Sequence, residues 1–402
     1  MRLACVAIPS RLRGFEIDAP SGQAFDVALR GERVTGIEPV PGPVRGTLAS
    51  ALVDVHVHLD KNYTVDEVGA ADGDLFAAIQ RSAAHRERWT GLAVRERMGR
   101  ALEDAWRSGT RAMRTHLDWV EPEDPLALGV FESLRSEWAG RIALQFVSLT
   151  PLDVFEDASA GERIAASVAR AGGVLGAFVY RNERLREKLA RVFELAERHR
   201  LDLDFHVDEG LDPEADGLEA IAALAAPAHW RGRVTCGHCC SLSVRPAAGA
   251  RATLCACAAA VIHLVALPTT NLYLQGAWDE TPVPRGITRL REAAEAGLRP
   301  CIATDNVADA FHPYGSYDLV ETFGLGVQVA HLSPADDWLD AVTSRPAAAM
   351  GLEWDGRIRI GCPADLVVLG ARTAHELLTP AGRSRTVIRG GRAIRNDLGE
   401  AR

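Results

Sequence analysis

The 402-residue sequence predicts an α/β fold, a (β/α)8 TIM barrel with a small β-sandwich domain formed by both termini. Three observations predict it. Short β-rich runs alternate with amphipathic helical stretches through the middle of the chain, histidines and acids follow the ends of these runs, and the two terminal segments lack the alternation. A parallel barrel beside a domain built from both chain ends accounts for all three.

The barrel is predicted over residues 50–354. Segments such as 183–200 and 285–297 place apolar residues three and four positions apart among charged ones, as helices that cover a sheet do. The eight predicted barrel strands are Ala51–Val55, Thr110–Thr115, Arg141–Ser148, Gly173–Tyr180, Leu201–Phe205, Arg233–Gly237, Val261–Leu267 and Arg299–Thr304.

The terminal segments, residues 1–49 and 355–402, carry short β-type runs separated by turn residues such as Gly390-Gly391. Since both ends share this character, we expect them to form one accessory β-domain beside the barrel. The clearest strands in these segments are Phe25–Leu29, Val34–Ile37, Asp365–Leu369 and Thr386–Arg389.

Composition favours a small-molecule partner. The chain has 45 Lys and Arg against 54 Asp and Glu, and without a long basic run it is not expected to bind nucleic acid. No segment offers the roughly 18 apolar residues of a membrane helix, and the apolar stretch at residues 3–9 is too short for a signal peptide. We therefore expect a cytoplasmic protein with no membrane partner, reduced cysteines and, as one option, a homo-oligomeric assembly.

Polar residues gather where the predicted strands end. His56 and His58 alternate along an extended run, so both imidazoles face the same side. The fifth, sixth and eighth strands end near His206, His238 and Asp305. These ends meet at one rim of a barrel, where neutral imidazoles and a carboxylate suit a catalytic ion such as Zn²⁺ or Fe²⁺.

The segment from His56 to Lys61 resembles the first-strand motif of the amidohydrolase superfamily. Segments 206–209, 237–241, 271–276, 285–289 and 304–309 are similar to the cytosine deaminase branch, and segment 364–369 is typical of the superfamily's accessory β-domain.

This resemblance implies that one metal is bound by four residues, His56, His58, His206 and Asp305. Members of the superfamily with two metals usually bridge them with a lysine of the fourth strand, and the predicted strand Gly173–Tyr180 contains none. We therefore predict one divalent ion, Zn²⁺ or alternatively Fe²⁺.

The predicted activity is hydrolytic deamination of an amino-substituted nitrogen heterocycle, of the cytosine, isocytosine or pterin kind. Such an enzyme is a hydrolase of C–N bonds in cyclic amidines, with attack by a metal-bound hydroxide. Glu209, three residues beyond His206, is the predicted proton shuttle to the ring nitrogen and the leaving group. His238 and Asp305 are predicted to orient and deprotonate the water.

Substrate recognition departs from the cytosine deaminase pattern. The glutamine expected after the third strand is missing from residues 147–152, and Asn306 stands where a second aspartate is expected. Lys61 and the Asp305-Asn306 pair are similar to the N-isopropylammelide amidohydrolases. The candidate substrate contacts are Lys61, Tyr180, Arg181, Gln275, Asn306 and Phe311.

Three other readings remain open. An ammelide-type enzyme would release an alkylamine from an N-alkylamino-triazine, and only the leaving-group pocket distinguishes it from a deaminase that releases ammonia.

A helical zinc deaminase needs H-x-E followed by P-C-x-x-C. His85-Arg86-Glu87 offers the first part, but Thr235 precedes Cys236 where proline is required. A non-enzymatic metal-binding barrel would have no need of Glu209.

Overall fold

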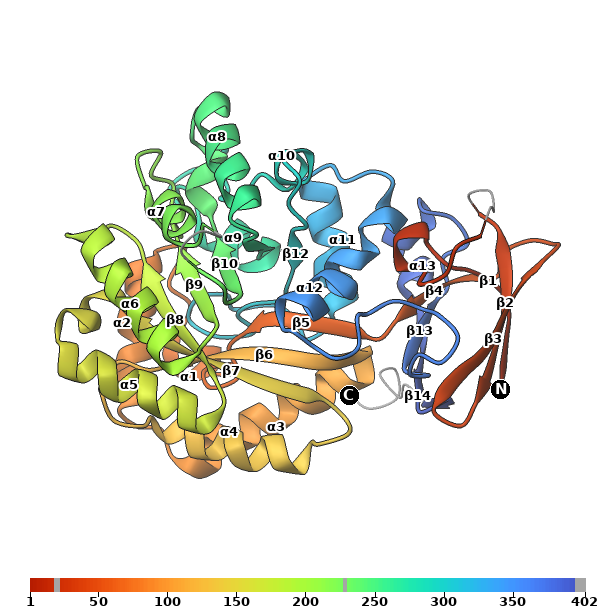
Figure 1. Cartoon of the computed structure of the whole chain (residues 1–402), viewed down its shortest axis with the longest axis horizontal. Coiled ribbons are helices and arrows are strands. Elements are labelled where there is room, and N and C mark those ends of the chain that lie inside the picture. Colours follow the sequence, from red (N-terminus) through yellow and green to blue (C-terminus); the bar gives the residue numbers. More distant parts are fainter. Residues whose placement is uncertain (18–21, 227–229, 395–402) are drawn as a thin grey trace.

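An eight-stranded parallel sheet forms the centre of the computed structural model, which describes residues 1–17, 22–226 and 230–394 (Figure 1). Its ends approach each other because the backbone N–H of Asp305 donates to the carbonyl of His56, 3.0 Å away. The predicted barrel is thereby confirmed. In order its strands are β5 (Leu52–Val57), β6 (Thr110–Asp118), β7 (Ala143–Pro151), β8 (Val174–Val179), β9 (Leu203–Val207), β10 (Val234–His238), β11 (His263–Ala266) and β12 (Cys301–Ile302).

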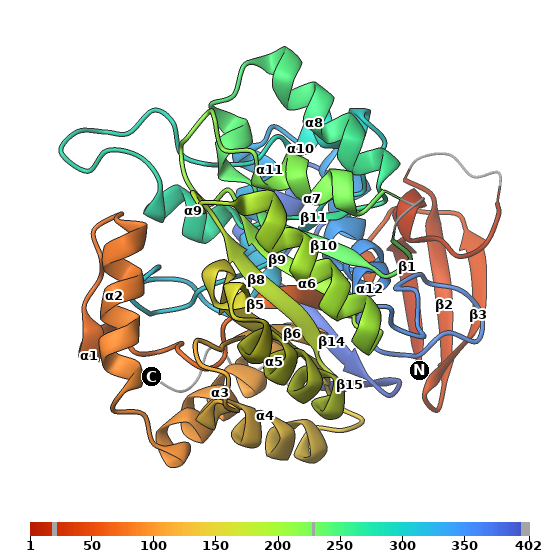
Figure 2. The same ribbon diagram turned by 60° about the vertical axis from the view of Figure 1, so that its left-hand side comes forward.

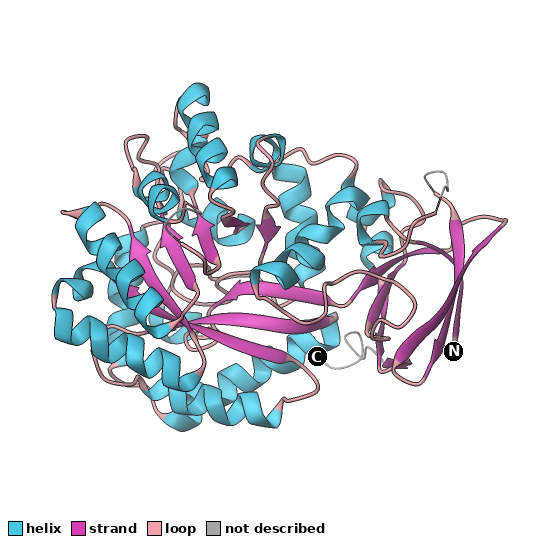
Figure 3. Cartoon of the chain, viewed as in Figure 1, coloured by secondary structure: helices cyan, strands magenta, loops and turns pink. Residues whose placement is uncertain are grey.

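Helices surround the strands, as Figure 3 shows. The helix predicted over residues 183–200 is α6, whereas the one predicted over 285–297 shortens to α10, because Gly286 adopts a left-handed φ of 70°. The larger helices are α2 (Leu75–Arg86), α3 (Gly91–Ser108), α4 (Leu126–Glu137), α5 (Ala158–Ala171), α6 (Leu185–His199), α7 (Gly217–Leu224), α8 (Ala247–Ala259) and α11 (Leu319–Val329).

Several shorter helical segments connect these elements. The α-helical ones are α1 (Val65–Val68), α9 (Pro268–Leu274), α10 (Leu290–Glu295), α12 (Ser344–Ala349) and α13 (Pro380–Arg383), and the 3-10 helices are η1 (Ser10–Leu12), η2 (Leu152–Glu156), η3 (Cys240–Ser243), η4 (Ala335–Val342) and η5 (Glu376–Leu378). Among the described residues, no helix has the length and apolar character needed to cross a bilayer.

Both chain ends contribute to a second sheet, as predicted. Its strand order is β15-β14-β13-β4-β1-β2-β3, and β1 and β4 are its parallel pair. Figure 1 shows β13 and β14 on the side nearer the barrel and β2 and β3 on the outer side. The strands are β1 (Arg2–Ala7), β2 (Ala24–Arg30), β3 (Arg33–Val40), β4 (Gly46–Ser50), β13 (Leu366–Leu369), β14 (Arg385–Arg389) and β15 (Arg392–Ile394).

Three of these strands, β1, β4 and β15, were not predicted. β4 is separated from barrel strand β5 by Ala51 alone, so the two read as one apolar run in the sequence. Hydrogen bonds join all seven strands into one continuous sheet. The domain limits 1–49, 50–354 and 355–402 remain predictions, and residues 395–402 lie outside the described part of the chain.

The eight cysteines are all free thiols, so no disulfide constrains the fold. Five of them, at positions 236, 239, 240, 257 and 301, are fully buried within the barrel region. Cys255 differs from the rest, because its side chain is exposed on α8. Packing of the helices around the sheet, rather than covalent linkage, therefore positions the barrel rim.

Candidate active site

Four predicted metal ligands converge at the carboxyl ends of the barrel strands. The Nε2 atom of His206 lies 3.2 Å from Nε2 of His56 and 3.2 Å from Nε2 of His58. Asp305 Oδ1 lies 3.2 Å from His58 Nε2 and 3.6 Å from His56 Nε2. Residues distant in the sequence therefore direct four ligand atoms at one point.

These spacings fit a divalent ion. Tetrahedral ligation at bond lengths of about 2.0–2.1 Å places ligand atoms roughly 3.3–3.4 Å apart. Both carboxylate oxygens of Asp305 are buried and accept no hydrogen bond within the described chain. A buried charge without a partner is costly, and a cation at this point would remove that cost. The residues present therefore fit a metal centre.

Burial keeps the imidazoles in the form that binds metal. The pKa values of His56, His58 and His206 are lowered well below the ordinary histidine value, first by burial and then by neighbouring positive charge. All three rings are neutral near pH 7, so each can offer a nitrogen lone pair to a cation.

Two residues at the rim have an unusual backbone conformation. His238, the last residue of β10, has a φ of 67°, and Asp305, just after β12, has a φ of 64°. A left-handed φ is costly for residues other than glycine and is typical of functional sites.

Glu209 follows β9 and is buried beside the predicted metal ligands, where it lines a cavity at the barrel rim. Its Oε1 lies 3.4 Å from Nδ1 of His238. The preceding residue, Asp208, accepts hydrogen bonds from the backbone N–H groups of Gly217 and Leu218 at the start of α7. This anchor holds Asp208 outside the barrel, and the next residue faces inward.

The electrostatics of this pair suit proton transfer. Burial raises the pKa of the Glu209 carboxyl well above its ordinary value, and Asp305 raises it further. Burial lowers the pKa of His238 to about 4. The site therefore places a carboxyl group that holds its proton more tightly than an ordinary glutamate beside a neutral imidazole.

A cavity of about 680 Å³, including the part open to solvent, lies over the cluster. Its lining is mainly apolar, and includes Leu149 and Pro151 in the segment where the cytosine deaminase glutamine was expected. Phe178 and Phe311 provide flat surfaces against which a planar ring can pack. A cavity of this kind is typical of small-molecule sites.

Three of the six predicted substrate contacts line this cavity, namely Lys61, Asn306 and Phe311. Lys61 Nζ donates to Oδ1 of Asp118 at 2.5 Å and lies 5.2 Å from the centre of the Phe311 ring. Asn306 donates its amide N–H to Oδ2 of Asp309 at 2.7 Å. Its amide oxygen remains an acceptor for a ligand.

The other three predicted contacts, Tyr180, Arg181 and Gln275, are not among the residues that line the cavity. Arg181 has a left-handed φ of 56°, and its side chain is 58% exposed and paired with Asp212. Tyr180 is buried and stacks on Phe76 instead. The structure does not bring these three side chains to the cavity, since a position after a strand end does not fix which way the side chain turns.

Asp118 and His116 belong to the site and were not predicted. The second barrel strand was expected to end at Thr115, but β6 continues to Asp118. His116 stacks 3.9 Å from His56, between ring centres, and belongs to the histidine group that could hold a metal. The alternation of His116 and Asp118 was a usable signal of the kind that identified His56 and His58.

A polar column supports the cluster from inside the barrel. The Nε2 atom of His116 lies 3.3 Å from Asp204 Oδ1, and Arg114 Nη1 donates to Asp204 Oδ2 at 2.9 Å. Arg114 also bonds to Gln145 and Thr235. The aliphatic residues typical of barrel interiors are here replaced by a charged network beneath the metal ligands.

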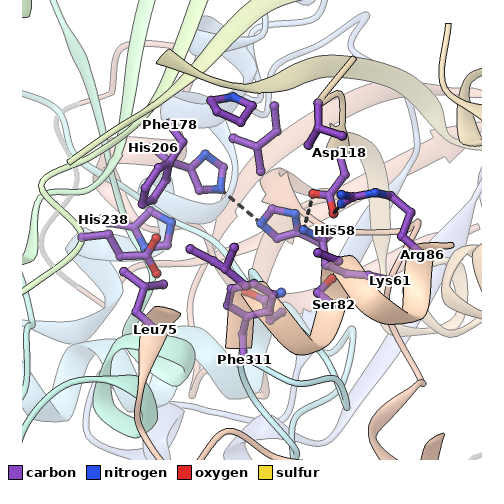
Figure 4. Close-up of a pocket in the computed structure, with 17 residues that line it drawn as sticks. His58, Lys61, Leu75, Ser82, Arg86, Asp118, Phe178, His206, His238 and Phe311 are labelled. Carbon is purple, nitrogen blue, oxygen red and sulfur yellow. Dashed lines mark hydrogen bonds and ion pairs between the residues drawn. The ribbon is translucent and has the colours of Figure 1, made fainter. Parts of the chain in front are cut away.

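Figure 4 shows how the cavity is divided. His206 and His238 lie on one side, Lys61, Asp118 and Arg86 on the other, and His58 between them.

Fold and site together define the class: a barrel hydrolase with a divalent-metal centre at its carboxyl rim.

Comparison with known proteins agrees with this class. Residues 104–394 match the model of an amidohydrolase family, Amidohydro_3, and the chain belongs to that family. It is 38% identical over 360 residues to a pterin deaminase of Rhizobium rhizogenes, covering 89% of this chain and 82% of that protein. It is 23% identical to an N-isopropylammelide isopropyl amidohydrolase of Pseudomonas sp. strain ADP, covering 93% and 94%.

A solved structure extends the comparison. The 5-methylcytosine deaminase of Klebsiella pneumoniae superposes with a TM-score of 0.85 at 26% identity, covering 98% of this chain and 97% of that one. The resemblance to the deaminase branch of the amidohydrolase superfamily is thereby confirmed.

Proposed function

We propose that the protein removes the amino group of a pterin-like heterocycle by hydrolysis and releases ammonia. The observation that carries this proposal is one cavity lined by buried Glu209 together with His58, His206 and His238 of the histidine and aspartate cluster. As a member of its family the protein is a hydrolase of C–N bonds in cyclic amidines. The pterin deaminase relative supports a pterin as substrate, and the 5-methylcytosine deaminase supports the broader class of amino-substituted nitrogen heterocycles.

One divalent ion, held by His56, His58, His206 and Asp305, would supply a hydroxide nucleophile near pH 7 by lowering the pKa of a bound water. Glu209, whose carboxyl pKa burial raises well above its ordinary value, donates a proton to the ring nitrogen next to the amino-bearing carbon. This protonation makes the carbon electrophilic. Glu209, now a carboxylate, takes the proton of the hydroxyl group added to this carbon and passes it to the amino group, which leaves as ammonia while the carbonyl forms. The proton that Asp305 removed from the water then returns to Glu209.

His238 and Asp305 have different roles in orienting and deprotonating the attacking water. The amide nitrogen of Asn271 lies 3.1 Å from Nδ1 of His238 and donates a hydrogen bond to it. The ring proton is then on Nε2, which has no partner among the described residues. His238 therefore orients the water or the substrate oxygen as a donor, and deprotonation is left to Asp305.

A second candidate function is removal of an alkylamine from an N-alkylamino-triazine. Lys61 and Asn306 at the cavity wall favour it, together with the 23% identical ammelide relative. The two functions share the metal centre and Glu209, and they differ in the size of the group that leaves.

A substrate panel tests the proposal. Metal-loaded protein is incubated with pterin, cytosine, isocytosine and N-isopropylammelide, and the released ammonia and isopropylamine are measured. We expect ammonia from pterin at the highest kcat/KM. Isopropylamine without ammonia would establish the second candidate, and no release from any compound by fully metallated protein would favour a metal-binding barrel without this activity.

Lys61 offers a sharper test of substrate binding, because it is one of two lysines in the chain. Lys61→Met is expected to lower kcat/KM by about 10- to 100-fold, mainly through KM, as loss of a charged hydrogen bond does. Lys188→Met, which removes the other lysine, a residue that does not line the cavity, is the matched control. A KM equal to that of the wild type in Lys61→Met would exclude contact with the substrate.

A further inference from the structure

Helix α2 forms one wall of the cavity, although it is not part of the ring of helices that covers the barrel. It lies between β5 and β6 in the sequence, and Figure 2 shows it beside the barrel, apart from α3 to α6. Leu75, Ile79, Ser82 and Arg86 face the cavity at helical spacing. The first two are apolar, and the last two bring polar groups to the side of Lys61.

The Ser82 hydroxyl is the first sign that this wall binds a ligand. Ser82 is 7% exposed, it lines the cavity, and its Oγ has no hydrogen-bond partner among the described residues. Leaving a buried hydroxyl unpaired costs roughly 1–3 kcal/mol, so such groups normally have a partner. A bound molecule that offers an oxygen would satisfy it.

Arg86 is the second sign. The structure gives its guanidinium one hydrogen bond among the described residues, from Nη1 to Oδ2 of Asp118 at 2.9 Å. A guanidinium has five N–H donors, and the remaining ones are available at the cavity wall. Asp118 also accepts a hydrogen bond from Lys61, so the guanidinium and the ammonium share this one carboxylate.

We propose that Ser82 and Arg86, together with Lys61, form a second recognition subsite for an oxygen acceptor on the heterocycle. This oxygen lies on the edge of the ring remote from the amino group that leaves, since Lys61, Ser82 and Arg86 lie across the cavity from His238 (Figure 4), and Glu209 Oε1 lies 3.4 Å from His238 Nδ1. The inference rests on the proposed function. It narrows the substrate class to amino heterocycles with a carbonyl or carboxylate oxygen on that edge, and it assigns specificity to α2.

The test measures dissociation constants for three matched rings. 2-Aminopteridine lacks the oxygen, pterin has a ring carbonyl, and a carboxylated pterin adds a carboxylate. Binding is measured in the metal-loaded Glu209→Gln protein, so that no ligand is consumed. Arg86→Met is expected to raise Kd for one or both oxygenated rings by about 10- to 100-fold, and Ser82→Ala by about 2- to 10-fold, with Kd for 2-aminopteridine unchanged.

The control is Arg88→Met, which removes the same charge from an exposed position just beyond α2. The ring whose Kd rises most identifies the oxygen that the subsite binds. Equal effects on all three rings, no effect, or no binding of any ring would overturn the subsite. Ser82→Ala gives the same information if Arg86→Met does not fold. Lack of ammonia release by wild-type protein with normal, oxygen-dependent binding would overturn the proposed function alone.

Discussion

Replacing Glu209 by glutamine is expected to lower kcat/KM by at least about 10²-fold while the bound metal stays at one equivalent. Glutamine has the same shape and can keep the same place beside His238, whose Nδ1 lies 3.4 Å from Glu209 Oε1. It cannot carry a proton from one atom to another. The loss therefore belongs to kcat, and substrate binding changes little. Steady-state kinetics and metal analysis on the same preparation measure both quantities.

The matched control is Glu214→Gln, which makes the same change at an exposed position five residues further along the chain. It is expected to keep wild-type kcat/KM. If Glu209→Gln retained more than about a tenth of the wild-type value, Glu209 would not be the proton shuttle. Loss of metal from this variant would instead show that Glu209 helps to hold the ion.

Replacing His206 by alanine is expected to have the larger effect, with loss of both metal and activity. His206 Nε2 is 3.2 Å from both His56 and His58, so its removal takes away the ligand at the centre of the set. Without the ion, water keeps a pKa of about 15.7 in place of about 7, and almost no hydroxide forms near pH 7. We expect less than about a tenth of an equivalent of metal after dialysis, and a fall in kcat/KM beyond about 10³-fold.

Metal content by elemental analysis is the primary measurement, because it does not depend on the substrate. His375→Ala, at an exposed position in the accessory sheet region, controls for loss of a histidine. A full equivalent of metal in dialysed His206→Ala would refute the ligand set. It would also make His116, which lies within the same group of imidazoles, the candidate for the replacement ligand.

The barrel and the convergence of the predicted metal ligands could be foreseen because both follow from local patterns. Apolar residues at a period of two or near four mark strands and helices, and a parallel barrel brings all carboxyl strand ends to one rim. His56, His58, His206 and Asp305 each lie at or just after such an end. Their convergence needs no knowledge of side-chain packing.

The cavity wall was not predictable in this way. Arg86 is the last residue of α2, which α1 separates from β5 and α3 separates from β6 along the chain, so its place at the cavity depends on how α2 packs. Arg181 shows the converse. Its position after β8 suggested a substrate contact, but a left-handed backbone turn directs the side chain to Asp212 and solvent.

The sequence alone determined the barrel and the accessory sheet from both termini, and it predicted the metal ligands and the acid Glu209, because strand ends and alternation depend on short-range periodicity. Tertiary structure alone decided which groups meet the substrate opposite Glu209. Lys61, Asp118, Ser82 and Arg86 come from three separate elements, and their contacts arise from the packing of α2 across the rim. Packing depends on the shape of the whole core, and the spacing of residues along the chain does not specify that shape.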